Sequence, residues 1–137
     1  MRTGQGRTPS PSARCVSDSG RLFELEVADL CKTLGFEVQG QTTLGKRLWG
    51  TSRKVDLTLG YPGRPFLGIE CKMQRSRGSV EEKCVATLLD IKTWPIHGIL
   101  VYHGPGFSRP MRGYLGRQEH AVRFDDLTKW LEKWKAT

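Results

Sequence analysis

The spacing of apolar residues predicts a helix early in the chain. The segment "GRLFELEVADLCKTLGFEV" carries an apolar stripe, at the i, i+4, i+7 and i+11 positions of one helix face, formed by Phe23, Val27, Leu30 and Leu34. Gly35 follows directly, and glycine is a common residue where a helix ends. We therefore expect a helix that begins near Ser19, ends before Gly35 and buries this stripe.

Three shorter apolar segments follow and read as strands. "FEVQG" is the first, "VDLTLGY" alternates apolar and polar residues as the second, and "FLGIECKM" is the third. The basic segment "LGKRLWGTSRK" joins the first two as a hairpin turn with strand-like flanks, and the tight turn "YPGRP" joins the second and third.

The second half of the chain predicts a helix, a strand, a long loop and a last helix. Ser79 and Glu82 form a capping box before the helical "VEEKCVATLLDIKTW", which Pro95 ends. "HGILVYHG" is a nearly continuous apolar strand, and "PGFSRPMRGYLGRQEH" reads as a loop. After an Asp cap, a helical stripe is formed by Leu127, Trp130, Leu131 and Trp134. The predicted fold class is α/β, with a mixed central sheet of about four to five strands flanked by helices.

The beginning of the chain differs in composition from the rest. Residues 1–19 combine Gly, Pro, Ser, Thr and Arg with few large apolar side chains, so we expect a flexible basic tail before a single domain over residues 20–137. The sequence has neither an apolar run of about 18 residues nor the apolar core of a secretory signal. We expect an intracellular protein, cytoplasmic or nucleoid-associated, without a membrane partner.

Composition indicates a class of partner only through charge. The chain has 22 Lys and Arg against 14 Asp and Glu, a formal net charge of +8, which favours a polyanion such as DNA. The 4 cysteines form no CxxC pair or Cys/His cluster, so we expect reduced thiols rather than a zinc site or disulfides.

Two carboxylates and a lysine interrupt the apolar strands. Glu70 and Lys72 are two positions apart and therefore share one face of a strand, while Asp56 lies on the preceding strand. One interpretation is an ion pair on a solvated face. The other is a hydrolytic site, in which two carboxylates bind Mg²⁺ and the lysine orients or deprotonates a water and stabilises the transition state.

The ordered set of "FELEVADLCKTLGFEV", "KVDLTLG" and "LGIECK" resembles the core of the PD-(D/E)XK nuclease superfamily, especially small members such as archaeal Holliday junction resolvases and short restriction-type endonucleases. The resemblance covers roughly residues 20–104 and implies a restriction-endonuclease-like core in α-β-β-β-α-β order. It implies that Asp56, Glu70 and the backbone carbonyl of Cys71 bind metal, with Lys72 as the catalytic lysine. Val55 replaces the proline of the motif.

Two further site residues remain open alternatives. The family often adds an acidic residue from the first helix, and here Glu24 is preferred over Glu26 as that catalytic and metal-binding residue. The alternative is that either glutamate only stabilises the helix, because acidic residues are favourable in the first helical turns. Gln74 lies on the same strand face as Lys72 and is either a catalytic residue that bonds the water or phosphate, or an ordinary polar residue at a strand end.

Basic residues near the predicted site are the candidates for DNA contact. They are Lys46, Arg47, Arg53, Lys54, Arg75 and Arg77, with a second group in the late loop formed by Arg109, Arg112 and Arg117. Trp49, within the first basic segment, either stacks on a base or is half-buried packing.

These features together predict a Mg²⁺-dependent endodeoxyribonuclease, with Mn²⁺ as a substitute metal, that acts on DNA structures or short sites. Cleavage of both strands needs two active sites, so we expect a homodimer, and a partner protein could supply specificity. The alternatives are an inactive nuclease-fold DNA-binding module, such as a subunit of a DNA-processing complex, and a protein-interaction domain.

Overall fold

The computed structural model describes residues 11–76, 78 and 80–137. Within these ranges the elements are α1 (Pro11–Thr33), β1 (Glu37–Lys46), β2 (Ser52–Tyr61), β3 (Arg64–Met73), α2 (Val80–Ile91), β4 (His97–His103), α3 (Arg109–Gly116), β5 (Ala121–Arg123), the 3-10 turn η1 (Phe124–Asp126) and α4 (Leu127–Ala136). None of the described helices combines the length and apolar content needed to cross a membrane.

The described strands form one mixed sheet in the order β1-β2-β3-β4-β5. The pairs β1–β2 and β2–β3 are antiparallel, whereas β3–β4 and β4–β5 are parallel. The parallel connection from β3 to β4 passes through α2, the usual crossover for parallel strands. The predicted α/β fold class and its mixed sheet of about four to five strands are confirmed, with a restriction-endonuclease-like arrangement of elements.

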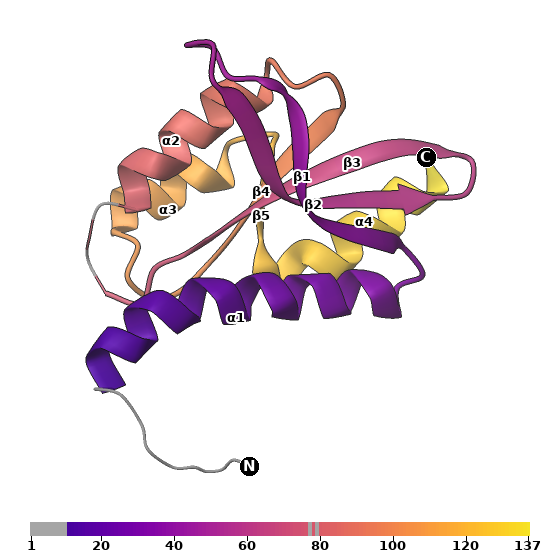
Figure 1. The fold of residues 1–137 in the computed structure, drawn as a ribbon. Helices are drawn as coiled ribbons and strands as arrows, with labels where there is room; N and C mark the ends of the chain where they lie inside the picture. Colours follow the sequence, from indigo (N-terminus) through magenta and orange to yellow (C-terminus); the bar gives the residue numbers. More distant parts are fainter. Residues whose placement is uncertain (1–10, 77, 79) are drawn as a thin grey trace.

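Helices cover both faces of the sheet (Figure 1). One core lies between the sheet and the helices α1 and α4, and includes Phe23, Val27, Cys31, Ile69, Val101, Leu127 and Leu131. The other lies between the sheet and the helices α2 and α3, and includes Cys84, Leu88, Leu100, Tyr102, Met111 and Leu115. β4 contributes side chains to both cores and is therefore buried over most of its length, whereas the apolar residues of β3 pack in the first core only.

The first helix confirms the predicted stripe and corrects its start. Phe23 and Val27 are buried, and Gly35 adopts φ +97° directly after the helix, a conformation that strongly favours glycine. The helix begins at Pro11 rather than near Ser19. Proline is compatible with the first helical turn, and residues 11–19 of the predicted tail form the start of α1. Residues 1–10 of that tail lie outside the described residues.

The late segment predicted as a loop contains α3. Ser108 caps this helix, because its hydroxyl accepts a hydrogen bond from the N–H of Met111, and proline follows within the first turn. Met111 and Leu115, four positions apart, are buried against the sheet. The prediction was wrong because the glycines and arginines of this segment obscured a helix that tertiary burial stabilises.

Two predicted helix caps have different outcomes. Asp126 occupies the N-cap of α4 but its side chain makes no capping hydrogen bond, and instead lies 3.5 Å from Arg123. Ser79, in the predicted capping box, lies outside the described residues. At the start of α2, the N–H of Val80 donates to Oε1 of Gln74 (3.1 Å).

The last helix is tied to distant parts of the chain. The ammonium of Lys135 donates to the carbonyl oxygen of Leu34, at the end of α1 (2.9 Å). Nε of Arg64 donates to the carbonyl oxygen of Trp134 (2.9 Å), and the guanidinium lies 4.3 Å from the centre of that tryptophan ring. These contacts fix α1, α4 and the β2–β3 turn relative to one another.

Candidate active site

The predicted catalytic strand residues meet where β2 and β3 separate. The two strands pair from Tyr61↔Arg64 to Leu57↔Ile69, and beyond this point β2 continues its pairing with β1 while β3 continues with β4. Figure 1 shows the β1–β2 hairpin turning away from β3. We call the position where they part the fork. Asp56 and Glu70 are the first residues past the last β2–β3 pair, so Asp56 lies within β2 rather than at its end.

Two side-chain hydrogen bonds replace the strand ladder at the fork. The backbone N–H of Asp56 donates to Oε1 of Glu70 (2.9 Å), and the backbone N–H of Cys71 donates to Oδ2 of Asp56 (2.8 Å). Each carboxylate therefore satisfies a backbone donor of the opposite strand that the divergence would otherwise leave without a strand partner. This reciprocal arrangement fixes the position of both carboxylates.

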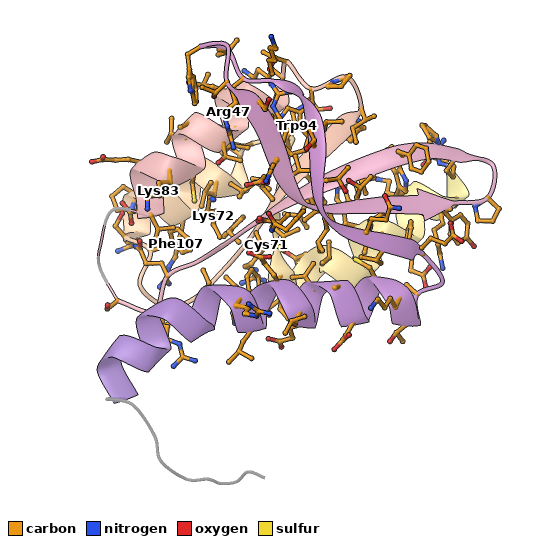
Figure 2. The ribbon with its side chains drawn as sticks, in the orientation of Figure 1. Arg47, Cys71, Lys72, Lys83, Trp94 and Phe107 are labelled. Carbon is orange, nitrogen blue, oxygen red and sulfur yellow. The ribbon has the colours of Figure 1, made fainter. Side chains whose placement is uncertain are left out.

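Lys72 lies beside Glu70 on the same face of β3, as the two-residue spacing predicted. Its ammonium is 3.7 Å from Oε2 of Glu70, and 24% of its side chain is exposed compared with 11% for Glu70. Cys71, between them, belongs to the core under α1, and Figure 2 shows Lys72 nearer to α2. The lysine thus supplies a positive charge that is only partly withdrawn from solvent.

Glu24 reaches the fork from α1 through a residue that the sequence analysis missed. Nε2 of Gln41 lies 3.5 Å from both Oε1 of Glu24 and Oδ1 of Asp56. Gln41 adopts φ +49°, which is uncommon for a residue other than glycine and often marks a functional site. Glu26, the alternative, is exposed and makes no such contact. The backbone conformation and the two contacts of Gln41 identify it as a site residue, and no sequence pattern predicts either of them.

Burial and the charge of Asp56 raise the pKa of two carboxyl groups at the fork, those of Glu70 and Glu24. Burial raises the pKa of Glu70 to about 7, the charge of Asp56 adds to the rise, and Lys72 opposes it. Burial and the charge of Asp56 likewise raise the pKa of Glu24. Negative charge is therefore in excess at the fork, and a bound cation would relieve it.

The fork fits a divalent cation by its chemistry but is not a complete cage. Hard carboxylate oxygens suit Mg²⁺, which usually takes one or two carboxylates and keeps several waters. In the described part of the chain, no group of at least three His, Cys, Asp or Glu side chains is arranged to hold a metal ion. A cation here would therefore be held by Asp56 and Glu70 with water, rather than enclosed by the protein alone.

A groove of about 750 Å³ opens from the fork between α1 and the β1–β2 hairpin. It is lined by Gly20, Arg21, Glu24, Leu25, Ala28, Lys32, Val38, Gly40, Gln41, Asp56 and Leu57. Arg21 and Lys32, at its α1 side, are exposed basic residues that the sequence analysis did not select. The groove gives solvent and ligands access to Asp56 and Glu24.

Gln74 is buried at the end of β3, where its amide joins two other segments. Its Nε2 donates to the carbonyl oxygen of Gly106 (2.9 Å), and its Oε1 accepts from the N–H of Val80. Only 4% of the residue is exposed. These contacts give Gln74 a structural role and occupy the groups that would bond a water or phosphate, so they favour the second of the two interpretations.

Arg53 was wrongly predicted to contact DNA. It is 1% exposed, and its guanidinium forms a two-point pair with Asp90 of α2, at 2.8 Å (Nε to Oδ2) and 3.0 Å (NH2 to Oδ1). It also donates to the carbonyl oxygens of Leu44 and Lys46. The side chain is therefore buried and paired, as a buried guanidinium has to be, and it is not available to DNA.

The other candidates for DNA contact are divided between the surface and internal contacts. Lys46, Lys54 and Arg75 are exposed. Arg47 is 31% exposed in its side chain and lies 3.4 Å from Asp90, so it is partly engaged. Arg77 lies outside the described residues. The three late arginines, all exposed, are at α3 or directly after it.

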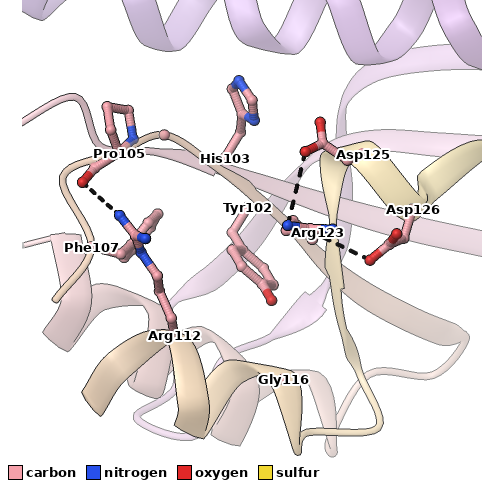
Figure 3. Close-up of a pocket in the computed structure, with 10 residues that line it drawn as sticks. Tyr102, His103, Pro105, Phe107, Arg112, Gly116, Arg123, Asp125 and Asp126 are labelled. Atoms are coloured by element: carbon pink, nitrogen blue, oxygen red, sulfur yellow. Dashed lines mark hydrogen bonds and ion pairs between the residues drawn. The ribbon is translucent and has the colours of Figure 1, made fainter. Parts of the chain in front are cut away.

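A second cavity, of about 600 Å³, lies at the carboxyl ends of β4 and β5 (Figure 3). Its arginines are already held, because Arg112 donates to the carbonyl oxygen of Pro105 (2.8 Å) and Arg123 lies 4.0 Å from Asp125 and 3.5 Å from Asp126. The positive charges in this cavity are thus largely balanced, and Asp56, Glu70 and Lys72 do not line it.

Comparison with known proteins supports the fold and gives the family. No curated protein matches the chain. A crystal structure of a protein of unknown function, AF1548, is similar with a TM-score of 0.52 at 18% identity, over 73% of this chain and 54% of that chain. At that identity the similarity shows the fold alone, and our chain spans about half the length of that protein. A PD-(D/E)XK nuclease superfamily domain matches residues 16–135, and the chain therefore belongs to the PD-(D/E)XK nuclease superfamily.

Proposed function

We propose that the chain is a Mg²⁺-dependent endodeoxyribonuclease that hydrolyses DNA phosphodiester bonds at the fork. Membership of the superfamily supports a nuclease-type function. The observation that carries the finer proposal is the reciprocal bonding of Asp56 and Glu70 across the fork, with the ammonium of Lys72 at 3.7 Å from Glu70. A structural ion pair alone does not need a second carboxylate held open towards a groove.

Asp56 and Glu70 are the residues that would hold the cation. Each uses one oxygen for a backbone N–H, at 2.8 Å and 2.9 Å. The other oxygen has only a longer contact, at 3.5 Å to Gln41 for Asp56 and at 3.7 Å to Lys72 for Glu70, which a cation would replace. The backbone carbonyl of Cys71 would complete the protein ligands, Glu24 would act through a water bound to the metal, and Mn²⁺ would substitute for Mg²⁺. When bound, the metal would polarise the scissile phosphate and lower the pKa of an attacking water.

Lys72 would act on the developing negative charge. Its ammonium lies on the face of β3 that also carries Glu70, and is exposed enough to reach a phosphate. There it would orient the water and stabilise the charge that accumulates on the phosphoryl oxygens. Exposed basic residues along the hairpin and after β3, namely Lys46, Lys54 and Arg75, would hold neighbouring phosphates.

The substrate would be a DNA structure or a short site. Cutting both strands would use two copies of the site, and hence a homodimer. If the protein is instead an inactive DNA-binding module, it will bind DNA in chelator and leave it intact in Mg²⁺.

The test is cleavage of supercoiled plasmid in Mg²⁺ and in chelator. Lys72→Ala should reduce the rate roughly 100-fold to 1000-fold, the usual effect of removing one preorganised stabiliser. Lys129→Ala, which removes an exposed lysine of α4, is the matched control and should cleave at the wild-type rate. Asp56→Asn should also abolish cleavage, but Mn²⁺ should restore part of it, whereas no metal should rescue Lys72→Ala. Wild-type rates in both variants would refute the assignment.

A further inference from the structure

The β1–β2 hairpin ends in two exposed apolar side chains. We call residues 46–51 the hairpin tip. Leu48 and Trp49 are each 66% exposed, more than any other large apolar residue described. Figure 1 shows the hairpin projecting beyond α2, away from both cores. These side chains belong to neither core, and their exposure has an unfavourable solvation free energy.

The tip is nevertheless rigidly built. The N–H of Arg47 donates to the carbonyl oxygen of Thr51 (2.8 Å), and the N–H of Gly50 donates to that of Arg47 (2.9 Å). Gly50 adopts φ +93°, which closes the turn without strain. A bulge between Thr43 and Lys46 increases the local twist of the hairpin.

The buried pair described above supports the tip from below. Arg53 donates to the carbonyl oxygens of Leu44 and Lys46, on the opposite strand of the hairpin, while Asp90 anchors the same guanidinium to α2. Arg47 lies between Asp90, at 3.4 Å, and the ring of Trp49, whose centre is 5.7 Å from the guanidinium carbon. Nε1 of Trp94 also donates to Asp90 (3.0 Å), and Figure 2 labels both Arg47 and Trp94. A preorganised aromatic side chain loses little entropy when it binds a partner.

Charge identifies the partner of the tip as nucleic acid. Lys46 and Lys54 are exposed on either side of Trp49, and residues 42–55 contain no acidic side chain. Alternation of basic and aromatic side chains is how proteins hold unstacked bases, because cations track the phosphates while the ring stacks on a base. An apolar protein surface would not require this positive border.

We propose that the hairpin tip is a wedge that stacks Trp49 on an unpaired base, so that the protein selects DNA in which a base step is disrupted. This specifies the substrate of the proposed nuclease and rests on that function. Trp49 lies seven positions before Asp56, and β2 begins at Ser52, so the two residues are at most about 23 Å apart at roughly 3.3 Å per residue. At about 3.4 Å per base pair, the wedge acts within about seven base pairs of the scissile phosphate.

Binding measured in chelator tests the wedge without using catalysis. A fluorescein-labelled duplex is compared with the same duplex carrying one mismatched pair. Trp49→Ala should weaken binding to the mismatched duplex about 5-fold to 150-fold, as expected for loss of one base stack, and should weaken binding to the perfect duplex much less. Phe66→Ala, which removes another exposed aromatic side chain (61%) at the far end of β2–β3, is the matched control and should bind both as the wild type does.

Salt dependence separates stacking from phosphate contact. Lys46→Ala should lower the salt slope of binding by about 1 and affect both duplexes alike, whereas Trp49→Ala should leave the slope unchanged. As a second readout, 2-aminopurine can serve as one base of the mismatched pair. Its fluorescence should change when wild type binds, because Trp49 stacks on an unpaired base, and should not change when Trp49→Ala binds.

Several results would overturn the wedge. One is an equal loss of affinity for the two duplexes in Trp49→Ala, and another is a loss of affinity in Phe66→Ala as large as in Trp49→Ala. A third is a change of oligomeric state in Trp49→Ala with unchanged DNA binding, which would assign the tip to a protein contact. Discrimination in chelator without any plasmid cleavage in Mg²⁺ would support the wedge and reject the nuclease. Cleavage without discrimination would do the reverse.

Discussion

Replacing Asp90 by alanine should destabilise the domain far more than removal of an ordinary ion pair. Asp90 is 3% exposed and accepts hydrogen bonds from Arg53, at 2.8 Å and 3.0 Å, and from Nε1 of Trp94, at 3.0 Å. Asp90→Ala leaves the Arg53 guanidinium buried at 1% exposure without its counter-charge.

The expected size follows from that unpaired charge. Breaking a buried pair by removing one partner costs about 3–5 kcal/mol, because the remaining ion stays desolvated. A domain of this size has about 5–15 kcal/mol of stability in total. At about 2 kcal/mol per molar urea, the unfolding midpoint should fall by roughly 2 M.

Urea unfolding followed by circular dichroism measures the change, with Asp125→Ala as the matched control. Asp125 is 59% exposed in its side chain and lies 4.0 Å from Arg123, so its loss should cost at most about 1 kcal/mol. If Asp90→Ala is destabilised no more than Asp125→Ala, the Arg53 site is hydrated and the reasoning from burial is refuted. A wild-type slope in both transitions is needed for the comparison.

Three further outcomes are expected. Burial acts to raise the pKa of Asp90, but hydrogen bonds from Arg53 and Trp94 outweigh it and lower the pKa below its usual 3.8. The stability advantage of wild type over Asp90→Asn should therefore be complete above about pH 4 and should disappear as the pH falls through the lower folded pKa. Urea unfolding at a series of pH values measures this advantage. Gly104 has φ +122°, and a Cβ there would lie 2.1 Å from the carbonyl oxygen of Gln74, so Gly104→Ala should lower the thermal midpoint, whereas Gly116→Ala, with no atom within 4 Å, should not. Glu24→Gln should slow Mg²⁺-dependent plasmid cleavage about 10-fold to 100-fold, and an equal loss in Glu26→Gln would contradict the position of Glu24 at the fork.

The sequence predicted those parts of the site that depend on local spacing. Two-residue periodicity put Glu70 and Lys72 on one face, and helical periodicity identified the buried face of α1, because both follow from backbone geometry alone. Arg53 was misjudged for the opposite reason. Its partner Asp90 is 37 residues away, and a basic residue in a basic segment gives no local sign of being buried.

The remaining misses have the same physical origin. Gln41 joins Glu24 and Asp56 through an unusual backbone conformation, and no residue type announces it. The helix α3 is stabilised by burial of Met111 and Leu115 rather than by intrinsic propensity. In each case a tertiary contact decides the local structure, so reasoning from sequence windows cannot find it.

The contact between α4 and the end of α1 affects the order in which the site can form during synthesis. Lys135 and Leu34 are 101 positions apart, and Arg64 and Trp134 are 70 apart. Contacts of such long sequence separation form late and slow folding. On the ribosome, α1 and the β1–β2–β3 meander can pack together as soon as they emerge, whereas the contact with α4 waits until the last helix has been made. The acidic groups of the fork all lie on α1, β2 and β3, so they should assemble early, and α4 should lock an arrangement that has already formed.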